Sequence, residues 1–407
     1  MKIIHTSDWH LGQKLLYNDR EEEHRLALDW LLDHIDQTQA DGLIIAGDVF
    51  DIGNPPNYAR RLYYRFLTRL QSTHCRHVLI IGGNHDSPAM LDAPKELLEA
   101  LNIHVLGAVS EDISDDIIEW KNEAGHVEAI LAAVPFLRDR DLHYSVAGEG
   151  GVERIERIKA AIKAYYEKIA AVIHQKYGQP TVPIIATGHL YASGADAPPG
   201  QDNIYIGDRE NIKADQFPAL FDYVALGHIH RPQMVGGLHH IRYSGSIIPL
   251  SFSETQDDKS VYLLHFEGRQ LQNVDVLPIP VFRRLKNIQG SLQQVEESLL
   301  QFAQKERAGL TPWIDVLVQT DQLIPQLDQR LADLTADLPI QLLKIRLERR
   351  LALQEPTIAM PDLEELQEME VFKMKCLAYG SPPEEMEELE TTFRELQTWM
   401  QEMEEDL

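Results

Sequence analysis

The sequence has few of the features that mark a secreted or membrane protein. Its 407 residues include only two cysteines, Cys75 and Cys376, and no CxxC pair, so no disulfide framework is expected. Residues 1–10 lack the charged-then-apolar order of a signal peptide, and no apolar run approaches the ~20 residues of a membrane helix. These absences predict a soluble, cytoplasmic protein.

Positive charge is scarce as well. The chain has 38 Lys and Arg against 64 Asp and Glu, a net charge of −26, and residues 361–407 alone contain 15 acidic and 3 basic residues. Such acidity argues against passive, nonspecific DNA binding by this chain alone. It does not exclude a site whose positive charge comes from bound metal. The sequence also contains no GxxxxGK[ST] phosphate-binding loop, so any ATP dependence would require a partner.

Short apolar runs alternate with helical patterns over residues 1–280. Strands are expected at Lys2–His5, Gly42–Ala46, His77–Ile81, Ala129–Val134, Val182–Thr187, Tyr223–Leu226, Ile241–Ser244 and Val261–Phe266. Helices are expected at Glu21–Gln37, Tyr58–Leu70, Asp92–Leu101 and Gly151–Tyr177. This order predicts an α/β fold in which two mixed sheets pack face to face with helices outside, a four-layer αββα sandwich.

The rest of the chain divides into smaller parts. Pro278-Ile279-Pro280 ends the first domain, and residues 281–349 repeat strand–helix–strand–helix–strand, which predicts a compact α/β domain. Residues 350–360 have the character of a linker. In residues 361–407 we expect a helical hairpin with a heptad seam, formed by Met386, Leu389, Phe393, Leu396, Met400 and Met403. This hairpin is either self-contained or, as we favour, a docking element for a partner.

Polar side chains follow five of the predicted strands. The chemically relevant ones are Asp8, His10, Asp48, Asp51, Asn84, His85, Asp86, His189, His228 and His230. Open α/β sheets bind ligands at the carboxyl ends of their strands, so we expect these side chains to converge. Each motif alone is weak, since a Gly-Asp turn or a single histidine is usually structural. Five such clusters in order are difficult to explain in that way.

Seven of these residues supply enough donors for two metal ions if Asp48 bridges them: Asp8, His10, Asp48, Asn84, His189, His228 and His230. Imidazole, carboxylate and amide ligands without thiolate favour Mn²⁺, with Fe or Zn as alternatives and Mg²⁺ less expected. His85 cannot easily join Asn84 on the same ion, because adjacent side chains diverge. We expect it to contact a phosphate or to protonate a leaving oxygen. Asp86 is expected to orient a ring or a turn.

The motifs resemble those of the calcineurin-like metallophosphoesterases. The segment HTSDWHLG at residues 5–12 narrows the resemblance to the DNA-repair nuclease branch, and YSGSIIPLSF at 243–252 with PFLR at 135–138 narrows it to the bacterial SbcD family. It covers almost the whole chain and implies a two-Mn²⁺ nuclease with a capping domain. One ion would be held by Asp8, His10, Asp48 and His230, and the other by Asp48, Asn84, His189 and His228. Some relatives carry histidine in place of Asp51, so this residue is expected to orient His85 or a ligand rather than to act directly in catalysis.

The resemblance also implies partners. It predicts an SbcC-like SMC-family ATPase bound through the C-terminal helices, a homodimer through residues 58–70, and DNA as substrate: double-stranded ends, hairpins and single strands. Two other interpretations remain open. One is a general phosphodiesterase or phosphatase with the same metals, although the extra domain and docking tail disfavour it. The other is a non-enzymatic scaffold, although that interpretation predicts missing ligands and none is missing.

Overall fold

The computed structural model describes residues 1–138, 140–142, 151–193, 195, 212–305, 309–320 and 324–349, with 369, 372, 373, 375, 376, 386 and 389–394 near the C-terminus. The chain forms two compact units, Met1–Arg349 and Arg350–Leu407. The linker expected at 350–360 and most of the expected hairpin lie outside the described residues. Within the described residues, no helix is both long and apolar enough to cross a membrane.

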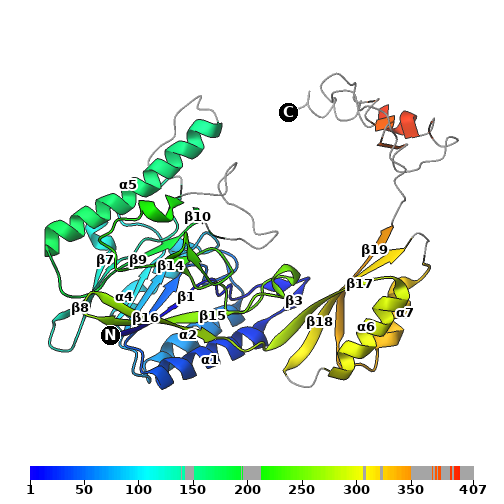
Figure 1. The fold of residues 1–407 in the computed structure, drawn as a ribbon, viewed down its shortest axis with the longest axis horizontal. Helices are drawn as coiled ribbons and strands as arrows, with labels where there is room; N and C mark the ends of the chain where they lie inside the picture. Colours follow the sequence, from blue (N-terminus) through cyan, green and yellow to red (C-terminus); the bar gives the residue numbers. More distant parts are fainter. Residues whose placement is uncertain are drawn as a thin grey trace. The chain divides into compact units, whose positions relative to one another are not determined.

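Two six-stranded mixed sheets dominate the first unit (Figure 1). The first has the order β16 (Gln270–Pro278), β15 (Ser260–Glu267), β1 (Lys2–Thr6), β4 (Gly42–Ala46), β5 (His77–Ile81) and β6 (Ile103–Leu106). The second has the order β13 (Gln233–Val235), β14 (Leu238–Tyr243), β12 (Tyr223–Gly227), β9 (Ile184–His189), β8 (Val127–Ala132) and β7 (Ile117–Lys121). Strands β1, β4, β5 and β6 run parallel, as do β14, β12, β9 and β8. Their carboxyl ends therefore open at a common edge of each sheet.

Strand β4 shows why the sheets are covered on both faces. All five of its residues are buried, as expected for a parallel strand with a layer on each side. Leu43 and Ile45 pack in the core that includes helices α1 and α2, whereas Ile44 and Ala46 pack between the two sheets. On the far side of the second sheet, helix α5 buries its apolar face against β9 and β12. The predicted four-layer αββα arrangement is confirmed.

The helices and short elements complete this frame. The helices are α1 (Glu21–Thr38), α2 (Asn57–Leu70), α3 (Pro88–Asp92), α4 (Lys95–Glu99) and α5 (Gly151–Tyr177), with 3₁₀ turns η1 (Ile113–Asp116), η2 (Ala214–Gln216) and η3 (Phe252–Glu254). Two short ribbons pair β2 (Lys14–Leu15) with β3 (Asn18–Asp19) and β10 (Ala192–Ser193) with β11 (Ile212–Lys213). The helix predicted around Asp92–Leu101 is present but shorter, as α4 at Lys95–Glu99, and a separate helix, α3, precedes it. Two five-residue helices flank Ala93-Pro94, because proline has no amide hydrogen to continue the first helix.

Residues 283–349 form a small sheet with helices on it (Figure 1). Parallel strands β17 (Arg283–Gly290), β18 (Leu310–Thr320) and β19 (Gln341–Arg349) alternate with α6 (Leu292–Lys305) and α7 (Leu327–Thr335). Arg283 joins this part to the sandwich: its Nε donates to Glu23 Oε1 on α1 at 2.9 Å, and its guanidinium lies 4.1 Å from the Trp313 ring centroid. Leu15 adds apolar contact by packing with Leu285 and Trp313.

In the second unit, the described residues form two helical stretches that touch. The rings of Phe372 and Phe393 stack with centroids 4.1 Å apart, and Lys373 Nζ lies 3.0 Å from Glu390 Oε1. Leu396, Met400 and Met403 of the predicted seam lie outside the described residues.

The core between the sheets gives a stability prediction. Leu79 is fully buried between them on β5, whereas Leu97 on α4 is 69% exposed. Leu79→Ala should lower the free energy of unfolding by about 2–5 kcal/mol, because it removes apolar contacts and leaves a cavity. Leu97→Ala should change it by less than ~0.5 kcal/mol. Urea denaturation of the two variants measures both, and equal losses would contradict this core assignment.

Candidate metal centre

The polar residues at the strand ends have an unusual backbone. Asp8, His10 and Asp48 adopt left-handed φ angles of 51°, 46° and 50°, and His228 has φ of 99°. Such angles are uncommon for residues other than glycine and persist where surrounding contacts enforce them. Here the His10 amide donates to the Asp48 carbonyl at 3.0 Å, and the His228 amide donates to Asp8 Oδ1 at 2.9 Å. These turns aim several side chains at one point.

Asp48 lies at the centre of the convergence. Its carboxylate is buried, with Oδ2 3.4 Å from His10 Nε2 and 3.2 Å from His189 Nε2. His10 lies in the loop that follows β1 of the first sheet, and His189 ends β9 of the second, so this one carboxylate faces ligands contributed by both sheets. Both histidines stabilise its anion, and the pKa of Asp48 is well below its ordinary value although burial alone would raise it.

Among the described residues, potential metal ligands gather in three overlapping groups, one of them formed by His10, Asp51 and His85. Asp8, His10 and His230 place ligand atoms within 4.8 Å of one another, and so do Asp8, Asp48 and His189. Asn84 Oδ1 is 2.9 Å from His189 Nε2 and 3.3 Å from His228 Nδ1. The structure therefore brings all seven residues predicted as metal ligands into one cluster.

Three of the histidine rings are oriented through Nδ1. This atom of His10 lies 3.1 Å from Asp51 Oδ1, that of His189 lies 3.0 Å from the Ala46 carbonyl, and that of His230 lies 3.2 Å from Glu254 Oε1. A ring that donates its Nδ1 hydrogen presents the Nε2 lone pair to a metal. The chemistry of the donor set therefore fits divalent ions.

His85 lies beside the cluster and is exposed. Its amide donates to Asp48 Oδ1 at 3.0 Å, and its Nδ1 lies 2.7 Å from the Asp51 carbonyl oxygen. The ring centroid is 4.9 Å from that of His10. His85 can thus face a bound substrate from the solvent side while its backbone is fixed by Asp48.

The buried Asp86 carboxylate binds backbone amides and organises the loops that carry the ligands. It accepts hydrogen bonds from the amides of Val49 at 3.1 Å, Phe50 at 2.9 Å and Gly83 at 2.9 Å. Burial and the nearby Asp48 carboxylate raise the pKa of Asp86 to about 6, against the opposing effect of these amides. It joins the loop after β4 to the loop after β5.

Two glycines leave room for this arrangement. A Cβ on Gly47, whose φ is +89°, would lie 2.2 Å from His189 Nδ1, and a Cβ on Gly83 would lie 2.1 Å from Asp48 Oδ1. Any larger residue at either position would displace a side chain of the cluster.

Sequence reasoning missed Glu254 and Lys259. Both are buried, and Lys259 Nζ lies 2.6 Å from Glu254 Oε2. The hydrogen bond with His230 and the Lys259 ammonium lower the pKa of Glu254 to about 2, although burial alone would raise it. Neither residue follows a strand in a recognisable motif, so only the tertiary contacts identify them.

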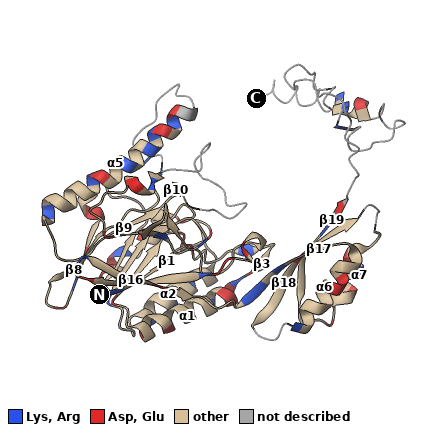
Figure 2. Ribbon diagram, in the orientation of Figure 1, with Lys and Arg blue, Asp and Glu red and all other residues tan. Residues whose placement is uncertain are grey.

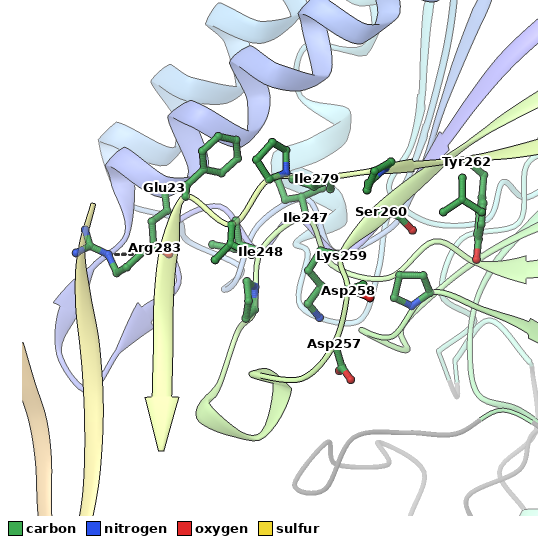
Figure 3. A pocket seen from close by; sticks show the side chains of 17 residues that line it. Glu23, Ile247, Ile248, Asp257, Asp258, Lys259, Ser260, Tyr262, Ile279 and Arg283 are labelled. Carbon is green, nitrogen blue, oxygen red and sulfur yellow. Dashed lines mark hydrogen bonds and ion pairs between the residues drawn. The ribbon is translucent and has the colours of Figure 1, made fainter. Parts of the chain in front are cut away.

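A separate cavity of about 580 Å³ lies between the sandwich and the start of β17 (Figure 3). Glu23, Ile247, Lys259, Tyr262 and Arg283 are among its lining residues, and none of the ten residues singled out from the sequence lines it. This cavity is distinct from the candidate metal centre.

Comparison with known proteins agrees with the geometry. A family model described as calcineurin-like phosphoesterase matches residues 1–232, more than half of the chain, and one described as type 5 capsule protein repressor C-terminal domain matches residues 281–378. The SbcD subunit of the nuclease SbcCD from Escherichia coli (strain K12) is 39% identical over 371 residues, covering 91% of this chain and 90% of the relative. The chain belongs to the SbcD family of the calcineurin-like phosphoesterases. It is an enzyme, a metal-dependent hydrolase of phosphoesters in a family of nucleases.

More distant members of the SbcD family also match. Proteins of the same name from Rhodobacter capsulatus and Bacillus subtilis are 34% and 33% identical. The matches cover 86% and 65% of this chain and 88% and 66% of the relatives.

Metal binding should release protons near neutral pH. Burial alone would lower the pKa of His10 and His189, but the neighbouring Asp51 and Asp48 carboxylates raise both to about 9, so the rings are protonated below that pH in the metal-free chain. A ring must lose its competing proton before it binds a divalent ion, so apparent affinity should rise with pH up to about 9. Calorimetric titration near pH 7 in two buffers of different ionisation enthalpy measures this release. A binding heat independent of the buffer would contradict it.

Proposed function

We propose that this chain is a DNA nuclease that cleaves phosphodiester bonds with two Mn²⁺ ions. The observation that carries the proposal is the buried Asp48 carboxylate with histidines on both sides, at 3.4 Å and 3.2 Å. One ion is assigned to Asp8, His10, Asp48 and His230, and the other to Asp48, Asn84, His189 and His228. The ligands are imidazole, carboxylate and amide, which suit Mn²⁺ better than Mg²⁺, with Fe and Zn as alternatives.

Each residue has a defined task in this proposal. Bound divalent ions supply a hydroxide nucleophile at neutral pH and offset the charge of the phosphate. His85, exposed beside the cluster, contacts the phosphate or protonates the leaving sugar oxygen. Asp51 orients the His10 ring through Oδ1 and receives His85 at its carbonyl, and Asp86 fixes the loops. Asp51 and Asp86 thus support the reacting groups without touching the substrate.

DNA is favoured as the substrate over a small phosphodiester. The relatives carry the name of the nuclease SbcCD, and the chain has a second α/β module and helical residues near its C-terminus that a small-molecule phosphatase does not need. By analogy, the proposed activities are exonuclease action on double-stranded ends and endonuclease action on hairpins and single strands, in cytoplasmic DNA repair, replication and recombination. A general phosphodiesterase with the same metals is the alternative.

A partner protein would supply the ATPase activity and the basic surface for DNA. In the described part of the chain, helix α5 carries both basic and acidic residues along its length (Figure 2). We propose that an SbcC-like SMC-family ATPase provides the basic track for DNA and the ATP dependence, and that residues 361–407 dock to it. The exposed side of α2, with Arg61, Tyr64 and Arg65, is the proposed homodimer contact.

The function is tested by cleavage of a hairpin-ended DNA duplex by the purified chain with Mn²⁺, with and without the coiled-coil ATPase and ATP. A nitrophenyl phosphodiester serves as the small-substrate control. Cleavage of DNA that rises with the partner supports the nuclease. Turnover of the small diester without DNA cleavage in any combination would favour the general phosphodiesterase, and no metal-dependent activity on either would favour a scaffold.

Two histidine variants separate chemistry from metal binding. His85→Ala should lower cleavage by about 10²–10⁴-fold, the usual contribution of a general acid, while Mn²⁺ stoichiometry stays unchanged. His228→Ala should instead weaken Mn²⁺ binding itself. Calorimetry and single-turnover cleavage on both variants measure the two effects. Loss of metal in the His85 variant would contradict the assignment of His85 to the reaction and His228 to metal binding.

A substitution that disrupts the proposed dimer contact should lower the molecular mass in solution without changing the activity of the metal centre. Tyr64→Glu places a carboxylate on the exposed side of α2, and it should shift the chain toward a monomer in analytical ultracentrifugation. Turnover of the nitrophenyl diester should persist, since α2 supplies no ligand. Gln301→Glu on the exposed side of α6, outside the proposed contact, is the charge control and should leave the dimer unchanged. An unchanged dimer in the Tyr64 variant would remove α2 from the interface.

A further inference from the structure

Glu254 is buried directly behind His230. The glutamate ends the turn η3 and is only 3% exposed, and its Oε1 lies 3.2 Å from His230 Nδ1. A buried carboxylate at this atom accepts the ring hydrogen from Nδ1. The lone pair of Nε2 is then the one that can point to a metal.

Several contacts fix Glu254 itself. Its Oε2 accepts from Lys259 Nζ at 2.6 Å and from the Leu250 amide at 3.1 Å. The same ammonium donates to the His230 carbonyl oxygen at 2.7 Å. Lys259 therefore holds the backbone of His230 directly and its ring through Glu254. The lysine is 5% exposed and is among the residues that line the cavity in Figure 3.

The two sides of the metal centre differ in the group that the histidine Nδ1 atoms contact. His10 and His230 each have a carboxylate at Nδ1, Asp51 and Glu254 respectively, whereas the Nδ1 partner of His189 is the neutral Ala46 carbonyl. A carboxylate behind a ring raises its basicity as a ligand more than a neutral acceptor does. The Asp8–His10–His230 side should therefore depend on these two carboxylates, of which Glu254 is buried and Asp51 is partly exposed.

We propose that Glu254, fixed by Lys259, is a positioning residue that holds His230 in the orientation and tautomer needed for metal binding, and that it strengthens the ion shared by His10 and His230. The inference rests on the proposed two-metal function. It assigns to Glu254 and Lys259 a selective effect on one of the two ions.

The experiment is Mn²⁺ titration of the full chain, with free Mn²⁺ followed by EPR. The main variant is Glu254→Gln combined with Lys259→Met, because removing both charges leaves no uncompensated charge in the interior. We expect one ion to bind as in the parent chain and the other to bind about 10–100-fold more weakly, the usual effect of losing a partner of a ligating histidine. At limiting Mn²⁺, the EPR signal should change from a spin-coupled pair to a mononuclear six-line spectrum.

Two further variants make the result decisive. Glu254→Asp keeps the charge opposite Lys259 but shortens the reach to His230, so it should weaken the same ion if the double variant does not fold. Asp275→Asn breaks the His265–Asp275 pair, 2.8 Å apart on β15 and β16, and should leave both ions unchanged. Folded Glu254 variants with both affinities intact would overturn the positioning role. A parent chain that binds no Mn²⁺ would overturn the proposed function, and this inference with it.

Discussion

The buried Asp48 carboxylate is the constraint on which the rest of the structure depends. It lies within 3.4 Å of His10 and 3.2 Å of His189, and it also accepts the His85 amide at 3.0 Å. A charge in the interior is tolerated only where several donors or a metal surround it. Satisfying this one group requires β4 and β9, which lie in different sheets, to end at the same edge. The face-to-face packing of the two sheets brings the ends of β4 and β9 together.

Much of the fold follows from local pattern. The strands that support the site are short apolar runs followed by Gly, Asp, Asn or His, and periodicity is enough to place them. The helix expected around Asp92–Leu101 was predicted to begin too early, because apolar spacing alone gave too little weight to Pro94, which separates α3 from α4. Edge strands such as β7, β13 and β16 were not predicted, since a strand with one side open needs no continuous apolar run.

The sequence did not predict the role of a site residue where that role depends on contacts with residues far away in the chain. Glu254 reaches His230 across 24 positions, and nothing near it in the chain indicates this partner. Asp51 was expected to orient either His85 or a ligand, and the structure gives it one contact to each: its side chain to His10 and its carbonyl to His85. Such choices depend on backbone geometry that no spacing rule encodes.

The left-handed backbone at Asp8, His10 and Asp48 also affects how mutagenesis of this centre should be interpreted. Alanine at these positions removes the chemical group and also disfavours the local turn, because it lacks the polar side chain that makes left-handed φ tolerable for Asp, Asn and His. A loss of activity on alanine scanning therefore mixes lost chemistry with a distorted loop. Asparagine tolerates this conformation and nearly matches aspartate in shape. At positions 8 and 48 it is the substitution that changes charge while the path of the chain stays the same.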